Sequence, residues 1–209
     1  MKKYLVELIG MFLFVLTVGM VAIDPGGAGN LAPLAIGSVL MILVYAGGHV
    51  SGGHYNPAVT LGVWLRGRLP AADVLPYWMA QIIGAVAATQ VVLYLKGNPA
   101  VTPPDLKTVP ALVAEFIGTF ALVYVVLNVA TARGTTGNSY YGLAIGFTVL
   151  VMAFALGPVS GGAFNPAIAT GITLLHLEKA GNFWIYLAGD FAGAALAALT
   201  FKITNPGDK

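Results

Sequence analysis

The sequence predicts an all-α membrane protein with six transmembrane helices and two re-entrant half-helices, arranged as an inverted three-helix repeat. The first observation is composition: 58% of the 209 residues are hydrophobic and only 9% are charged, whereas soluble domains average roughly 25% charged residues. The second is a set of apolar segments of membrane-spanning length, and the third is a unit of sequence that occurs twice. Together they favour a single membrane domain over residues 1–209.

Near-continuous apolar segments provide the six predicted spans. Each is long enough to cross the hydrocarbon core of a bilayer as a helix, which takes about 20 residues. The spans lie approximately at residues 4–23, 33–49, 76–95, 110–130, 140–157 and 182–203. The segments that connect them are rich in Pro, Gly, Asn and Thr, as turns are expected to be.

A repeat divides the chain into two halves, about 1–96 and 110–204. The segment VSGGHYNPAVTLG at 50–62 recurs as VSGGAFNPAIATG at 159–171, an offset of 109 residues. The tetrapeptide LAIG in the second predicted span recurs in the fifth with the same offset. Each half holds three spans, and an odd number of spans forces the second half to enter the membrane from the opposite side. The repeats are therefore expected to be related by a pseudo-two-fold axis in the membrane plane.

Two shorter apolar segments, about 55–67 and 164–176, are predicted to be half-helices. About ten helical residues rise only about 15 Å, roughly half the thickness of the hydrocarbon core. Neither segment can cross the membrane alone. In an inverted repeat, the two half-helices would meet head to head near the midplane.

The same tripeptide, Asn-Pro-Ala, begins both half-helices. Its members are Asn56, Pro57 and Ala58 in the first half and Asn165, Pro166 and Ala167 in the second. Asn is a preferred N-cap and Pro a preferred first helical residue, so a helix should begin at each Asn. If each amide oxygen caps its own helix, each amide NH₂ is left as a donor toward the space that the two helix ends share. The partial positive charge of both N-termini opposes cations there, while a neutral molecule can pass.

The doubled motif on an inverted three-span repeat resembles the aquaporin family, also called major intrinsic proteins, and the resemblance covers essentially the whole chain. It implies a passive channel for water and other small uncharged solutes that excludes ions. Glycerol, urea, ammonia, carbon dioxide and neutral metalloid hydroxides are the candidate solutes. The resemblance also implies a homotetramer in the lipid bilayer, with one pore per subunit and no cofactor.

The segments 47–53 and 157–162, which precede the two motifs, are rich in glycine and are expected to be non-helical. Non-helical backbone at membrane depth is tolerated only inside protein or beside a water-filled cavity. These pore loops, including Gly48 and Gly161, would therefore present a series of carbonyl acceptors along the pore.

The resemblance assigns roles to three further polar residues. Glu7 and Glu115, in the first and fourth spans, would brace the pore loops by accepting hydrogen bonds from their backbone N–H groups. His49 lies where the family keeps a loop histidine, so it either lines the channel or supports the loop. His54 and His176 have no partner that the sequence identifies, and we assign them no role.

Family members narrow the pore with four residues, usually including an Arg directly after the second Asn-Pro-Ala motif. The matching selectivity-filter positions of this chain are Ile36, Ala153, Gly162 and Ile168. They lack the aromatic, His and Arg residues of a strict water channel. We therefore expect a broad, mainly apolar ring that passes water together with a larger or less polar neutral solute. The open alternative is that Ile36 and Ile168 meet in an apolar constriction that gates by dewetting.

Asp190 lies within the sixth span, where an ionisable residue is costly and suggests function. A proton-coupled secondary transporter would use such a group. We favour a packing role, in which Asp190 hydrogen-bonds across a helix or subunit contact as Gln81 could at the equivalent position of the first half. A structural membrane protein that acts in adhesion would need longer loops than this chain has.

Enzymes and nucleic-acid-binding proteins are disfavoured by the residues themselves. The sequence brings together no nucleophile, metal cluster or acid/base pair, and it has no cysteine. A Cys-ligated metal site is therefore not expected, and we predict no metal site. The formal net charge of only +2 is far from the dense basic face of a nucleic-acid-binding protein.

We expect a multi-pass protein of the plasma (inner) membrane, and the distribution of Lys and Arg favours an orientation with both termini in the cytoplasm. That topology places seven positively charged residues inside and three outside. The inside set is Lys2, Lys3, Arg66, Arg68, Arg133, Lys202 and Lys209, and the outside set is Lys96, Lys107 and Lys179.

Overall fold

The computed structural model describes residues 1–208, which form a bundle of helices without a β-strand. Six helices within this range are long and apolar enough to cross a membrane. They are α1 (Lys2–Ala22), α2 (Ala32–Ser51), α4 (Ala71–Lys96), α5 (Thr108–Val126), α6 (Tyr141–Ser160) and α8 (Phe183–Thr204). The predicted fold class, an all-α membrane protein with six spans, is confirmed.

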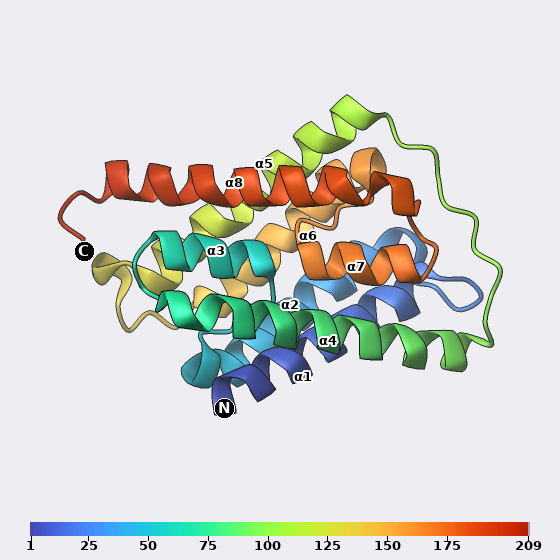
Figure 1. Cartoon of the computed structure of the whole chain (residues 1–209), viewed down its shortest axis with the longest axis horizontal. Helices are drawn as coiled ribbons and strands as arrows, with labels where there is room; N and C mark the ends of the chain where they lie inside the picture. The colour runs from blue at the N-terminus through green and yellow to red at the C-terminus, as the bar shows by residue number, and fades with distance from the viewer. Residues whose placement is uncertain (209) are drawn as a thin grey trace.

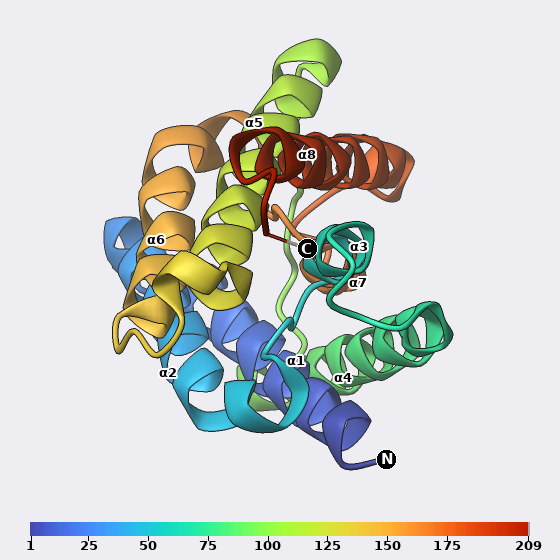
Figure 2. The same cartoon turned by 90° about the vertical axis from the view of Figure 1, so that its left-hand side faces the viewer.

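Two short helices, α3 (Pro57–Leu65) and α7 (Pro166–Leu174), occupy the middle of the bundle. They lie end to end along its long axis (Figure 1). In the view along that axis the two short helices overlap and lie between α4 and α8 (Figure 2). The start of α1 and the end of α8 lie at the same end of the bundle. We call this end the termini side and the opposite end the far side.

Glycines allow the long helices to approach each other closely. α1 packs along α4, and α5 packs along α8. A Cβ atom at Gly84 would lie 2.4 Å from the carbonyl oxygen of Leu8, and one at Gly193 would lie 2.5 Å from that of Phe116. Because no side chain fits at such distances, these contacts depend on small residues, as is common between membrane helices.

The glycine-rich segments before the Asn-Pro-Ala motifs become non-helical later than expected, so that part of the prediction is wrong. α2 continues to Ser51 and α6 continues to Ser160. Each helix ends at a glycine in the left-handed region, Gly52 at φ 89° and Gly161 at φ 87°. A glycine at this position is a common helix C-cap because it adopts positive φ without steric cost. The pore loops are therefore only the residues between these glycines and the asparagines.

Candidate functional site

The two asparagines of the motifs cap the short helices that they begin. The side-chain oxygen of Asn56 accepts a hydrogen bond from the backbone N–H of Ala58 at 2.8 Å, and that of Asn165 accepts one from Ala167 at 2.9 Å. A proline follows each asparagine as the first helical residue. Both asparagines are 2% exposed. The N-termini of α3 and α7 are thereby fixed in the interior of the bundle.

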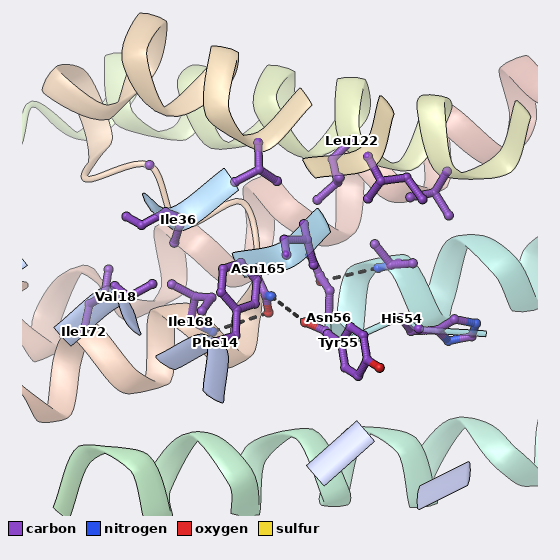
Figure 3. A pocket seen from close by; sticks show the side chains of 18 of the residues that line it. Phe14, Val18, Ile36, His54, Tyr55, Asn56, Leu122, Asn165, Ile168 and Ile172 are labelled. Carbon is purple, nitrogen blue, oxygen red and sulfur yellow. Dashed lines mark hydrogen bonds between the residues drawn. The ribbon is translucent and has the colours of Figure 1, made fainter. Parts of the chain in front are cut away.

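The same two amides also link the two halves of the chain. Nδ2 of Asn56 donates to the carbonyl oxygen of Phe164 at 2.8 Å. Nδ2 of Asn165 donates to that of Tyr55 at 2.8 Å (Figure 3). The sequence predicts a free NH₂ group at each asparagine. One of its two hydrogens is instead used between the pore loops, and both asparagines line the central cavity.

Tyr55 and Phe164, which directly precede the asparagines, have an uncommon backbone conformation. Their φ angles are 44° and 47°, a left-handed region in which bulky residues are rare. Their rings fill the space where Gly10 and Gly118 lack side chains: a Cβ at Gly10 would lie 2.0 Å from the Tyr55 ring, and one at Gly118 would lie 2.2 Å from the Phe164 ring. Such a conformation persists only when its surroundings hold it in place.

Glu7 contacts the first pore loop from α1. Its carboxyl group accepts hydrogen bonds from the backbone N–H groups of His54 at 2.9 Å and Tyr55 at 2.6 Å. The hydroxyl group of Ser51 donates to it at 2.7 Å, and the side-chain amide of Gln81 donates at 2.8 Å. Four donors therefore surround one fully buried carboxyl group.

Glu115 makes the equivalent contacts to the second pore loop from α5. It accepts hydrogen bonds from the backbone N–H groups of Ala163 at 3.1 Å and Phe164 at 2.6 Å, and from the hydroxyl group of Ser160 at 2.5 Å. Glu115 is also fully buried. The structure thus places both glutamates where they can brace the loops and leaves few of their lone pairs free.

Asp190 occupies the place that Gln81 has in the first half, and it is fully buried. One of its oxygens accepts a hydrogen bond from the hydroxyl group of Thr119 on α5 at 2.8 Å. The contact runs between α8 and α5 of one chain. Among residues 1–208, no group of three or more His, Asp or Glu side chains lies close enough together to hold a metal ion.

A narrow cavity, the lumen, runs past the ends of α3 and α7 (Figure 3). Its volume is about 50 Å³, and it adjoins a wider cavity on each side. The termini-side mouth, lined in part by Lys3, Arg68 and Arg133, has about 620 Å³. The far-side mouth, lined in part by Asn30 and Glu178, has about 600 Å³. Water and other small molecules could therefore approach the two asparagines from either end.

The four filter positions lie where the far-side mouth narrows into the lumen. Ile36 and Gly162 line both cavities, Ile168 lines the lumen, and Ala153 lines the mouth. Gly161 also lines both. The structure therefore brings together residues of α2, α6, α7 and the second pore loop, which the sequence alone could group only by resemblance.

Several residues that line the lumen received no role from the sequence, and Val18, Ile172 and His54 also line one of the two mouths. Val18 and Ile172 line the lumen and the far-side mouth. Ile172 lies one helical turn beyond Ile168 on α7, a spacing that could have identified it. His54 lines the lumen and the termini-side mouth, is 7% exposed, and has Nδ1 3.1 Å from the hydroxyl oxygen of Thr60. In the sequence, its position two residues before Asn56 could have indicated that His54 lies near the lumen.

The placement of Gly48 and His49 in a pore loop is wrong, because α2 extends through both residues. His49 is exposed and, with Gly48, lines a side cavity that shares Gly52 and Thr136 with the termini-side mouth. Neither residue lines the lumen. The histidine that does so is His54.

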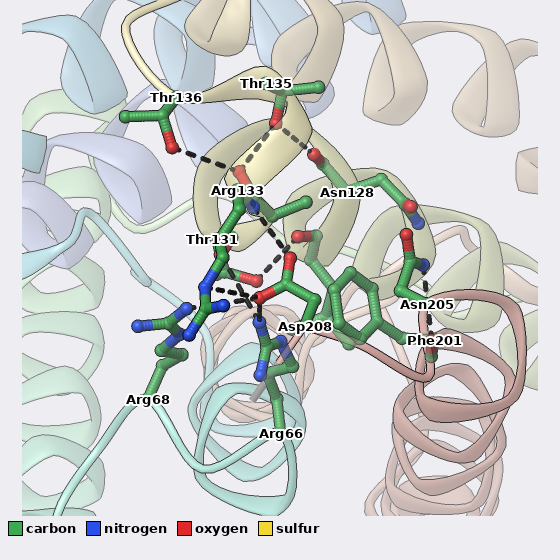
Figure 4. A network of polar contacts seen from close by, with 12 residues as sticks. Arg66, Arg68, Asn128, Thr131, Arg133, Thr135, Thr136, Phe201, Asn205 and Asp208 are labelled. Carbon is green, nitrogen blue, oxygen red and sulfur yellow. Dashed lines mark hydrogen bonds and ion pairs between the residues drawn. The ribbon is translucent and has the colours of Figure 1, made fainter.

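A cluster of arginines stands at the termini-side mouth and binds Asp208 (Figure 4). The Asp208 carboxyl group lies 2.6 Å from Arg66 and 3.2 Å from Arg68, and it accepts a hydrogen bond from the backbone N–H of Arg133 at 2.6 Å. That backbone donor, together with the nearby Arg66 and Arg68 guanidinium groups, lowers the pKa of Asp208 below its usual value. The Arg66 guanidinium also lies over the Phe201 ring at 4.3 Å, which adds a cation–π contact.

Comparisons with known proteins agree with this geometry. A family model described as "Major intrinsic protein" matches residues 1–201. Nodulin-26 of Glycine max is 40% identical over 177 residues, which cover 83% of this chain and 65% of that protein. Aquaporin AqpM of Methanothermobacter thermautotrophicus is 36% identical over 193 residues, which cover 85% of this chain and 78% of that protein. The chain thus matches about two thirds to three quarters of the length of these curated relatives.

A solved structure has the same architecture. The aquaglyceroporin from Plasmodium falciparum gives a TM-score of 0.83, with 98% of this chain and 97% of that chain covered. The sequence identity is 21%. At this identity the likeness shows the fold alone.

Proposed function

Because the chain belongs to the major intrinsic protein family, we propose that its lumen conducts water together with larger neutral solutes such as urea or glycerol, and that it excludes ions. Membership makes the chain a passive transmembrane channel for water and small solutes rather than an enzyme. We infer the wider solute range from the composition of the filter. The position after the second Asn-Pro-Ala motif is Ile168, not a cationic residue.

Pore diameter and lining hydrogen-bond groups set selectivity in channels of this kind. Ala153 and Gly162 contribute almost no side-chain volume to the narrowing, and Ile36 and Ile168 are aliphatic. Neither isoleucine carries a charge or a hydrogen-bond donor, whereas a guanidinium at this position would add a longer side chain with five N–H donors. The filter therefore leaves room for solutes larger than water.

Ion exclusion rests on two features of the lumen. The N-termini of α3 and α7 meet there at Asn56 and Asn165, and their partial positive charges oppose cations. Among the described residues that line the lumen, none is Lys, Arg, Asp or Glu. An ion that enters loses hydration without gaining a charged partner, which is costly.

The test compares wild-type protein with Ile168→Arg in proteoliposomes, measuring water flux and urea or glycerol flux in the same vesicles. Ile168→Leu is the matched control, because it keeps the filter apolar. Arg should reduce the flux of the larger solute by a greater factor than that of water, whereas Leu should leave the ratio nearly unchanged. A wild-type channel that already passes water alone would contradict the proposal that the filter is wide.

The orientation and assembly follow from the same proposal. Placing the termini side in the cytoplasm of a plasma (inner) membrane puts the arginines around Asp208 inside, in accord with the excess of positive charge in cytoplasmic loops. Reporter fusions at the C-terminus and near Asp105 should then report opposite sides. Homotetrameric assembly is proposed from family membership, and light scattering of the solubilised protein measures it.

A further inference from the structure

Glu178 is a buried carboxyl group at the far-side mouth. It lies between α7 and α8, lines the mouth cavity and is 3% exposed. Its Oε2 atom has no hydrogen-bond partner among residues 1–208. A buried acceptor without a partner is costly, so this oxygen is suited to accept a donor that a solute brings.

The surroundings make Glu178 distinctive within that cavity. Among the described residues of the far-side mouth, it is the one charged side chain, and Asn30 is the other strongly polar side chain. The remaining side chains are mainly aliphatic or aromatic. A solute with several O–H or N–H groups that enters this mouth therefore finds few side-chain acceptors, and Glu178 is the strongest of them.

The carboxyl group lies directly beside the filter. A Cβ atom at Gly161 would be 3.1 Å from Oε1 of Glu178, and Gly161 lines both the mouth and the lumen. The filter position Gly162 is the next residue. A solute bound at Glu178 would thus stand at the entrance to the narrowing. Burial raises the pKa of Glu178, and the nearby Asn182 side chain opposes this effect.

The repeat argues against a purely structural role for this acid. The equivalent position in the first half is Leu69, which lines the opposite mouth. The neighbouring tyrosine contact is the same in both halves: Tyr186 donates to the carbonyl oxygen of Ser160 at 2.7 Å, and Tyr77 donates to that of Ser51 at 2.7 Å. Since the first half makes this contact with a leucine in the equivalent place, the pore loop does not require the carboxyl group.

We propose that Glu178 is a solute-binding residue of the far-side mouth, where its carboxyl group accepts hydrogen bonds from the O–H or N–H groups of neutral solutes such as polyols or ureas before they reach the filter. This inference rests on the proposed function, because it names how that channel receives its larger solutes. Glu178 thereby favours donor-rich solutes over apolar ones of the same size.

The experiment measures occupancy of the mouth separately from passage through the filter. Water flux of wild-type proteoliposomes is recorded with increasing glycerol or urea at equal concentration on both sides. Binding at Glu178 should reduce water flux in a saturable manner. Glu178→Leu should raise the half-inhibitory concentration by roughly tenfold, the factor expected for loss of one hydrogen bond to a charged group. Glu178→Gln, which keeps a weaker acceptor, should raise it by a smaller factor.

The control variant is Asp105→Asn, which removes an exposed acid at the same end of the bundle that pairs with Lys179 and does not line this cavity. It should leave the inhibition unchanged. Absence of saturable inhibition in the wild type, or equal inhibition in Glu178→Leu and Glu178→Gln, would overturn the role of Glu178. Inhibition by sodium chloride in place of glycerol would also overturn it, because a cation would then be the ligand. If the wild type binds these solutes but does not pass them, only the proposed wide filter is contradicted, and the role of Glu178 stands.

Discussion

The side-chain nitrogen of Asn56 lies 2.8 Å from the carbonyl oxygen of Phe164, 108 residues away in the chain. The repeat makes the reciprocal contact, from Asn165 to Tyr55, at the same distance. Each asparagine therefore caps its own half-helix and holds the opposite pore loop. The two half-helices, the two loops and the lumen between them form one mechanically linked unit.

The first prediction concerns this link. Asn56→Ala and Asn165→Ala should each destabilise the protein by about 0.5–2 kcal/mol through the lost helix cap, and each should weaken the exclusion of cations. Thermal unfolding in detergent and ion flux in proteoliposomes measure the two effects. Asn56→Asp is the informative companion, because it keeps the capping oxygen and loses the donor. Unchanged flux and ion exclusion in both Ala variants would place the pore elsewhere in the bundle.

The second prediction concerns the positive φ angle of Phe164. Gly118→Ala would place a Cβ atom 2.2 Å from the Phe164 ring, so the ring and its loop must shift. We expect a loss of about 1–3 kcal/mol in stability, as for overpacked cores, and reduced water flux. Gly134→Ala is the control, since nothing lies within 4 Å of a Cβ there. Equal behaviour of the two variants would show that the ring contact does not position the loop.

The third prediction concerns Asp190. Asp190→Asn should preserve folding and water flux, and the flux of this variant should not depend on pH. In the first half of the chain, the equivalent residue Gln81 carries an amide, which donates to Glu7 at 2.8 Å. An amide at position 190 should therefore fit beside Glu115 in the same way. Stopped-flow measurements at several pH values test this. If the variant folds but no longer conducts, the chain uses Asp190 in proton-coupled transport.

The fourth prediction concerns pH and Asp208. Its pKa is lowered in the folded protein by the backbone N–H of Arg133 and by Arg66. A depressed folded-state pKa stabilises the protein above the unfolded-state value, and this stabilisation is lost as pH falls through the folded-state value. The melting temperature of the wild type should therefore fall in acid below about pH 4, and that of Asp208→Asn should fall less.

Asp105→Asn is the control for this comparison. Asp105 is exposed and its pKa is lowered by a hydrogen bond from Lys179, but exposed ion pairs contribute little to stability. Its acid dependence should resemble that of the wild type. If Asp208→Asn also follows the wild type, the arginine cluster does not depend on this carboxyl group for stability.

The sequence determined the fold class and the centre of the site. Span length follows from the thickness of the bilayer, so apolar segments of that length predict six helices without any tertiary information. Asn56 and Asn165 were identified because N-capping by Asn-Pro is a local preference of the backbone. The 109-residue repeat then required the two motifs to oppose each other.

Contacts between distant segments were decided by the tertiary structure. The sequence could not show that α2 passes through Gly48 and His49, because glycine both permits a loop and allows close helix packing, and only the neighbours decide which use applies. His54 gained its place in the lumen from a loop that Glu7 contacts and that contains the left-handed Tyr55. Glu178 gained its place in the far-side mouth from the path of the chain between α7 and α8. Local preferences specify where helices begin and end. Which side chains face the pore is fixed by packing between helices that lie far apart in the chain.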